Sequence, residues 1–181
     1  QVSFIAKSEV KSWPVFGFFA VLQRTVFVER ERRGKTGEQT SDIARRLADG
    51  DAMVLFPEGT TSDGNRVLPF KTALFGAAHA AIREAAVPEV IVQPVAIAYT
   101  GMHGMAMGRY HRPIASWPGD VQLMPHLKGI LKEGAIDVEI RFGEPIVVTA
   151  ETDRKALART MENRGRALLQ ASLHGREIVE D

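Results

Sequence analysis

One stretch organises the chain: Met53-Val-Leu-Phe-Pro-Glu-Gly-Thr-Thr-Ser-Asp-Gly-Asn-Arg-Val-Leu-Pro-Phe-Lys71. The short apolar run at residues 52–56 has the character of a buried strand, and it ends at Pro57. A polar loop containing Gly59 and Gly64 follows. Open α/β sheets place ligands in such loops, at the carboxyl ends of strands. The stretch therefore predicts either a ligand-binding loop or an ordinary solvated connection between a strand and a helix.

Several residues in and near this loop suit an anion. Backbone N–H groups at the two glycines, together with Arg66 and Lys71, can surround a negatively charged group. A third basic residue, Arg30, ends the β-branched run at residues 25–30, and its guanidinium can bind a phosphate through two hydrogen bonds.

Length and composition limit the class of protein. The 181 residues suit one domain, and 45% hydrophobic with 25% charged residues is typical of a globular protein. A net charge of +1 gives no reason to expect a nucleic-acid partner, and the absence of cysteine excludes disulfides and thiolate chemistry. No histidine spacing indicates a metal site.

Apolar patterns alternate between strand and helix along the chain. Strands are expected at residues 2–6, 25–30, 52–56, 90–99 and 135–142, and helices at 10–22, 36–49, 70–86, 121–131 and 152–174. Residues 100–119 are expected to form a long irregular connection. Gly50 and Thr152 are the expected helix caps, and Pro94 indicates a bulge or an edge. The alternation predicts α/β architecture with a largely parallel sheet.

Common nucleotide and hydrolase motifs are absent. The sequence has no phosphate loop, no dinucleotide glycine fingerprint and no Gly-x-Ser-x-Gly elbow. An anion-binding strand end near the aromatic segment at residues 13–19 instead suits an amphiphile with a charged head and a hydrocarbon tail.

Phe56-Pro-Glu-Gly-Thr60, followed by Leu68-Pro-Phe-Lys71, resembles the third conserved block of the glycerolipid acyltransferases, the 1-acyl-glycerol-3-phosphate acyltransferase or lysophospholipid acyltransferase family. Val26-Phe-Val-Glu-Arg30 is similar to the second block of that family, and Val92-Gln-Pro-Val95 is similar to the fourth. The segments Phe4-Ile-Ala-Lys7 and Trp13-Pro-Val-Phe-Gly17 match the region between the first and second blocks. The order of these segments agrees with the family over residues 2–98.

The resemblance implies a site for an acyl acceptor. It assigns Arg30, Glu58 and Gly59 to the glycerol phosphate of the acceptor, and an ionised Glu58 can accept a hydrogen bond from a hydroxyl. The full expected substrate-binding set is Arg30, Glu58, Gly59, Thr60, Thr61, Ser62 and Lys71. The resemblance implies no metal and no cofactor, with acyl-CoA or acyl-acyl-carrier protein as the thioester donor.

The chain departs from the family pattern in three places. The catalytic His-x4-Asp motif, in which His is the general base, is missing, so we expect it upstream of Gln1 in a longer protein and expect this piece alone to be inactive. Thr61 stands where many members carry Arg, which weakens a phosphate site. Arg24 stands where the second block usually has Gly.

These observations predict a single domain over residues 1–181, an αβα sandwich with a mixed, largely parallel sheet. The expected activity is transfer of a fatty acyl group to a lysolipid hydroxyl. The first expectation is 1-acyl-glycerol-3-phosphate, giving phosphatidic acid in bacterial phospholipid biosynthesis; lyso-ornithine lipid is the alternative acceptor. A non-catalytic lipid-binding, membrane-associated protein is the alternative of another class. The expected location is peripheral or anchored, at the cytoplasmic face of the inner membrane.

Overall fold

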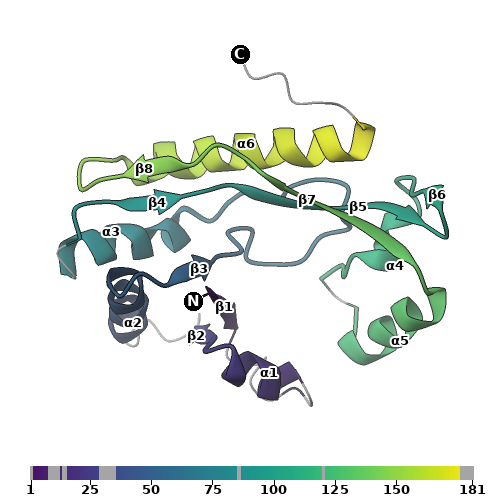
Figure 1. Ribbon diagram of the computed structural model, residues 1–181, viewed down its shortest axis with the longest axis horizontal. Helices are drawn as coiled ribbons and strands as arrows, with labels where there is room; N and C mark the ends of the chain where they lie inside the picture. Colours follow the sequence, from purple (N-terminus) through teal and green to yellow (C-terminus); the bar gives the residue numbers. More distant parts are fainter. Residues whose placement is uncertain are drawn as a thin grey trace. The chain divides into compact units, whose positions relative to one another are not determined.

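A computed structural model describes residues 2–7, 13, 16–28, 36–84, 87–119 and 121–175. The chain divides into two compact units, whose helices and strands are labelled in Figure 1. Unit 1 comprises Gln1–Pro57, Lys71–Val92 and Val147–Lys155. Unit 2 comprises Glu58–Phe70, Gln93–Ile146 and Ala156–Asp181.

Unit 1 contains a parallel three-stranded sheet with the order β2-β1-β3. Its strands are β1 (Val2–Lys7), β2 (Val26–Val28) and β3 (Ala52–Val54). In this register Ile5 lies opposite Val26 on one side of β1, and Phe4 lies opposite Val54 on the other. Because the chain crosses over between successive strands, through α1 (Phe16–Leu22) and then α2 (Thr36–Ala48), the strands can run parallel.

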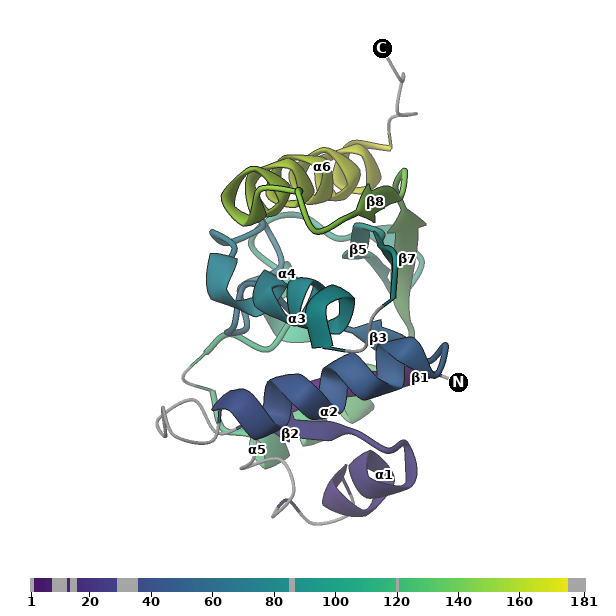
Figure 2. The same ribbon diagram turned by 90° about the vertical axis from the view of Figure 1, so that its left-hand side faces the viewer.

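One helix packs both on this sheet and on α3 (Gly76–Glu84). The contact is made by α2, which lies across the sheet in Figure 2 and buries Ile43 and Ala44. Gly50 follows α2 with a left-handed φ of 82°, and its N–H bonds to the Leu47 carbonyl, so the predicted glycine cap is confirmed.

The expected long strand over residues 90–99 is two strands. They are β4 (Val90–Val92), which pairs with β8 (Ile146–Val148), and β5 (Val95–Met102). The break falls at Gln93 and Pro94, where the ring of Pro94 removes a ladder donor. The Pro94 carbonyl accepts from Gly143 N–H at 2.9 Å, and the Gln93 side chain donates to the Gly143 carbonyl at 2.9 Å. Strand β8 was not expected from the sequence.

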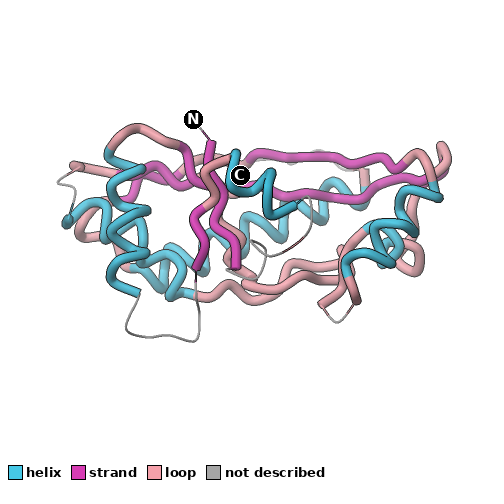
Figure 3. The backbone as a smooth tube through the Cα atoms, turned by 90° about the horizontal axis from the view of Figure 1, so that it is seen from below, coloured by secondary structure: helices cyan, strands magenta, loops and turns pink. Residues whose placement is uncertain are grey.

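Unit 2 is built on an antiparallel sheet with the order β6-β5-β7 and a helix that runs along it. The long pair of β5 and β7 is visible in Figures 1 and 3. The further elements are β6 (Met105–Ala106), α4 (Arg112–Ala115), α5 (Leu123–Glu133), β7 (Ile136–Phe142) and α6 (Arg154–His174). The core joins Ala96 and Ala98 of β5 to Leu168 and Leu169 of α6, where the small alanines let the helix approach closely.

Some predicted boundaries in these segments are wrong. The expected irregular connection over residues 100–119 contains the end of β5 as well as β6 and α4. Thr152 is not the N-cap of α6, because the helix begins at Arg154; the Thr152 Oγ1 instead accepts from Thr149 N–H at 2.9 Å and closes a turn before the helix. The expected helix over residues 70–86 begins as a 3-10 turn, η3 (Thr72–Phe75), and continues as α3 (Gly76–Glu84). The predicted α/β class, with parallel and antiparallel pairing, is confirmed.

Candidate functional site

The polar loop between β3 and η3 is closed at its base. Lys71 N–H donates to the Pro57 carbonyl at 2.8 Å, so the chain leaves and returns at one point. Gly59 and Gly64 have φ values of 70° and 74°, in the left-handed region that favours glycine. A Cβ on Gly64 would also lie 3.1 Å from the Ser116 Cβ, so that turn requires glycine for two reasons.

Short hydrogen bonds shape the interior of the loop. The Asp63 Oδ1 accepts from Asn65 N–H at 3.0 Å, and the Ser62 Oγ accepts from Gly64 N–H at 3.3 Å. Glu58 reaches across the loop, where its Oε2 accepts from Leu68 N–H at 2.6 Å. The carboxylate that the sequence assigned to the acceptor therefore also joins the two arms of its own loop.

The pKa values of the two carboxyl groups of the loop are shifted in opposite directions. Burial raises the pKa of Glu58, the bond from Leu68 N–H opposes that effect, and the negative charge of Glu162 adds to it. The hydrogen bond from Asn65 N–H lowers the pKa of Asp63, although slight burial opposes it. Glu58 is thus the carboxyl of this loop that takes up a proton more readily than usual.

A buried arginine ties the loop to the segment after β5. Arg112 is 9% exposed, and its Nη1 donates to the Asn65 Oδ1 at 2.7 Å. Its other nitrogens donate to the Met107 carbonyl at 3.0 Å and the Tyr99 carbonyl at 3.3 Å. The Asn65 Nδ2 donates in turn to the Arg109 carbonyl at 3.1 Å. Asn65 therefore links the tip of the loop to a fixed, buried cation.

Residues 68–70, where the chain leaves the loop, form its exit arm. A hydrogen bond fixes this arm to α6. Phe70 N–H donates to the Glu162 Oε2 at 2.8 Å, and the Arg166 Nη2 lies 2.5 Å from the Glu162 Oε1. The Phe70 ring lies over Gly165, where a Cβ would be 3.7 Å from the ring. Sequence reasoning missed Asn65, Arg112 and Glu162, whose partners lie up to 92 residues away along the chain.

The structure brings five of the seven expected site residues together on this loop. Glu58, Gly59, Thr60, Thr61 and Ser62 are consecutive, with Thr60 and Thr61 exposed. Gly119 lies beside them, because a Cβ there would be 3.6 Å from the Thr60 Oγ1. Lys71 is exposed at the base of the loop, in unit 1. Arg30 lies outside the described residues.

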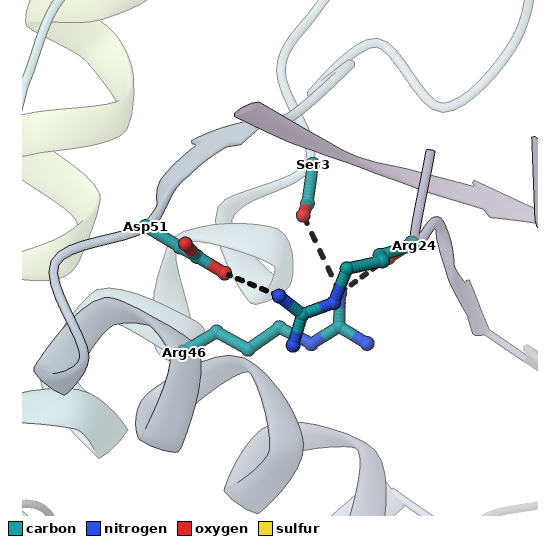
Figure 4. Close-up of polar contacts among 4 residues, drawn as sticks. All are labelled: Ser3, Arg24, Arg46 and Asp51. Carbon is teal, nitrogen blue, oxygen red and sulfur yellow. Dashed lines mark hydrogen bonds and ion pairs between the residues drawn. The ribbon is translucent and has the colours of Figure 1, made fainter. Parts of the chain in front are cut away.

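Arg24, which replaces the usual glycine of the second block, belongs to a polar cluster in unit 1 (Figure 4). Its φ is 54°, which explains why glycine suits this position. Its Nη1 lies 4.0 Å from the Asp51 Oδ2, and its carbonyl accepts from Arg46 Nη1. The same Arg46 nitrogen lies 3.4 Å from the buried Ser3 Oγ. The Arg24 side chain therefore has a partner in the scaffold of its own unit.

Three further features concern the residues that the structure describes. No group of three or more His, Asp or Glu side chains there could hold a metal ion. None of the helices in that part of the chain is both long enough and apolar enough to cross a membrane. His79 Nε2 lies 2.7 Å from the Thr152 carbonyl, a contact that joins α3 to the turn before α6.

Known proteins resemble this chain over most of its length. A family described as Acyltransferase matches residues 1–98. A lyso-ornithine lipid O-acyltransferase of Brucella abortus (strain 2308) is 84% identical over 99% of this chain and 67% of its own length. A lyso-ornithine lipid O-acyltransferase of Rhizobium meliloti (strain 1021) is 58% identical over 97% of this chain and 60% of its own length. The chain thus spans about two thirds of the length of these relatives.

A solved structure supports the fold. The crystal structure of the 1-acyl-sn-glycerophosphate (LPA) acyltransferase, PlsC, from Thermotoga maritima superimposes with a TM-score of 0.60 at 23% identity. The match covers 98% of this chain and 58% of the PlsC chain. At that identity the likeness speaks for the architecture, which agrees with the α/β fold described above. The conserved blocks and the matched family together show that this chain belongs to the acyltransferase family.

Proposed function

We propose that the protein transfers a fatty acyl group from a thioester to the hydroxyl of lyso-ornithine lipid. The observation that carries this proposal is the name shared by two relatives that match nearly the whole chain. The sequence put 1-acyl-glycerol-3-phosphate first and lyso-ornithine lipid second, and the relatives support the second acceptor better. Family membership favours catalysis over the non-catalytic lipid-binding alternative.

The loop chemistry agrees with an acceptor that is not a plain phosphate. Thr61 is exposed and offers a hydroxyl where many family members offer a guanidinium. Ornithine is an amino acid, so its lipid presents a carboxylate and an amine in place of a glycerol phosphate. Such a head group needs fewer cationic contacts and can use the Glu58 carboxylate as a hydrogen-bond acceptor.

In this proposal, the acceptor hydroxyl attacks the carbonyl carbon of acyl-CoA or acyl-acyl-carrier protein. An ester bond forms, the thioester bond breaks, and the hydroxyl proton passes through a general base to the leaving thiolate. The loop residues Glu58 to Ser62, with Arg30 and Lys71, would bind and orient the acceptor. The general base would be the histidine of a His-x4-Asp motif outside the present sequence.

The lipid acceptor implies contact with a membrane surface, and α1 is suited to it. Phe18 and Phe19 are 66% and 57% exposed, and Val21 and Leu22 beside them are also exposed. Residues 7–35, which surround this helix in sequence, contain seven Lys or Arg and three Glu, a net charge of +4 against +1 for the whole chain. Apolar side chains flanked by positive charge favour an anionic lipid surface. We expect peripheral or anchored attachment at the cytoplasmic face of the inner membrane.

The acceptor assignment is tested with the complete natural protein. Its kcat/KM would be measured with lyso-ornithine lipid and with 1-acyl-glycerol-3-phosphate, each with acyl-CoA and with acyl-acyl-carrier protein. We expect a preference of about a hundredfold or more for lyso-ornithine lipid, the scale that differential binding of a polar head group can provide. A preference for the phosphate acceptor would restore the first sequence interpretation. Lipid binding without turnover would support the non-catalytic alternative.

The membrane contact is tested by sedimentation with vesicles that contain phosphatidylglycerol. A protein carrying Phe18→Ser and Phe19→Ser should lose most vesicle binding. The matched control is Ile140→Ser with Phe142→Ser, because both side chains are also exposed but lie on β7. Equal losses in the two proteins would mean that α1 is not the contact surface.

A further inference from the structure

A carboxylate on α6 holds the loop that carries the expected acceptor site. The Glu162 Oε2 accepts from Phe70 N–H at 2.8 Å, although the two residues are separated by 92 positions. A second carboxylate binds the same arm of the loop, since the Glu58 Oε2 accepts from Leu68 N–H at 2.6 Å. Two carboxylates thus bind N–H groups two residues apart on one exit arm.

Glu162 is itself fixed in place. The Arg166 Nη2 lies 2.5 Å from its second oxygen, one helical turn further along α6. Its side chain is 19% exposed, so the hydrogen bond to Phe70 N–H is only partly open to competition from water. The Phe70 ring lies against α6 at Gly165, where a Cβ added to the glycine would be 3.7 Å from the ring. Both the backbone and the ring of Phe70 therefore contact one short stretch of α6.

We propose that Glu162 is a positioning residue that sets the place of the Glu58 carboxylate through the exit arm of the loop. Glu58 accepts a hydrogen bond from Leu68 N–H. Leu68 in turn is held in place because Phe70, two residues later, is bound to Glu162. The inference rests on the proposed function only in taking Glu58 as a group that binds the lysolipid acceptor. Loss of the Glu162 carboxylate would loosen the exit arm and misplace Glu58 without touching the thioester.

The charge of Glu162 has a second consequence, which concerns the pKa of Glu58. Burial raises the pKa of Glu58, the hydrogen bond from Leu68 N–H opposes that effect, and the negative charge of Glu162 on α6 adds to the rise. Arg166 is the cation paired with Glu162. Replacing Glu162 by Gln keeps an oxygen for Phe70 N–H but removes the charge. The pKa of Glu58 should then fall, so the acidic limb of acceptor kcat/KM should move to lower pH. A merely structural role of Glu162 would not move that limb.

The experiment compares Glu162→Ala, Glu162→Gln and the neighbouring exposed control Asn163→Ala in the complete natural protein. For Glu162→Ala we expect the KM for lyso-ornithine lipid to rise about tenfold, with the KM for the thioester unchanged, because misplacing one binding group weakens binding of its own substrate. For Glu162→Gln we expect a rise of about threefold or less, with the shifted pH limb. Asn163→Ala should match the natural protein.

Hydrogen exchange of the Leu68 and Phe70 amides separates the two proposals. Faster exchange in Glu162→Ala supports the anchoring role whether or not any acyl transfer is found. Unchanged exchange together with an unchanged acceptor KM would overturn the role of Glu162 and leave the proposed function standing. Absence of acyl transfer to lyso-ornithine lipid in the natural protein would overturn the proposed function, and exchange alone would then decide on Glu162.

Discussion

Two arginines, one in each unit, bind backbone carbonyls in similar ways but hold different parts of the molecule. In unit 1, Arg46 donates to the Arg24 carbonyl and lies 3.4 Å from the Ser3 Oγ, so it joins α2 to the parallel sheet and its connection (Figure 4). In unit 2, Arg112 donates to the Tyr99 and Met107 carbonyls and to the Asn65 side chain. Only Arg112 has a partner on the candidate loop.

This difference in partners distinguishes Arg46, which stabilises the scaffold of unit 1, from Arg112, which also holds the loop of the candidate site. A guanidinium satisfies several carbonyls at once, which suits a place where chain segments converge without a regular ladder. At Arg46 those segments belong to the scaffold of unit 1, so its loss should affect folding alone. At Arg112 one segment is the loop with Glu58 to Ser62, so its loss should affect both folding and acceptor binding.

The largest effect is expected for Arg112→Ala. Removing a buried cation with three hydrogen bonds leaves polar partners without their donor, which should lower the free energy of unfolding by about 3 kcal/mol. Denaturant unfolding measures this loss. The kcat/KM for the acceptor should also fall about a hundredfold, beyond any loss of folded protein, because the loop tip is released. Acceptor kinetics that stay normal per folded molecule would break the comparison.

Arg46→Ala should affect stability alone. The buried Ser3 hydroxyl and the Arg24 carbonyl lose a donor, and we expect a loss of about 2 kcal/mol by denaturant unfolding. The acceptor KM of the remaining folded protein should be unchanged. A raised acceptor KM would show that the scaffold of unit 1 also shapes the site.

Two glycines with similar backbone angles sharpen the comparison. Gly50 in unit 1 and Gly64 in the loop have φ values of 82° and 74°. A Cβ on Gly50 meets nothing within 4 Å, whereas one on Gly64 lies 3.1 Å from the Ser116 Cβ. Gly50→Ala should therefore cost about 1 kcal/mol from the backbone alone, and Gly64→Ala about 2 kcal/mol with an added rise in acceptor KM. Equal costs in unfolding experiments would mean that the loop yields to the methyl group.

The smallest effect is the pH dependence of Glu58. Because its pKa in the folded protein is raised, its favourable contribution is present below the unfolded value and is lost as pH rises through the folded value. Relative to Glu58→Gln, the natural protein should gain stability as pH falls from neutral toward the ordinary range of glutamate. Unfolding at several pH values measures the difference. A constant difference would show that Glu58 has no raised pKa.

The local pattern of residues along the sequence determined several helices and strands, the family and the backbone angles of the glycines. The apolar periodicities predicted α2, β7 and α6 because side chains repeat along a helix or a strand whatever they later contact. The block Phe56 to Thr60 also indicated the family and placed Glu58, Gly59 and Thr60 on one loop. The left-handed angles of Gly50, Gly59 and Gly64 follow from residue type as well.

Tertiary structure decided which distant groups meet. Arg112 and Asn65 are 47 residues apart, and Glu162 and Phe70 are 92 apart, so no local spacing could pair them. Gly143, which follows β7, forms hydrogen bonds with Gln93 and Pro94 at the break between β4 and β5, although it lies 50 residues from Gln93 along the chain. The direction of β7 was decided in the same way, since it pairs antiparallel with β5, with Phe142 opposite Val95. A sequence specifies side chains and their repeat, whereas a hydrogen bond needs two groups within about 3 Å, and only the folded chain brings such groups together.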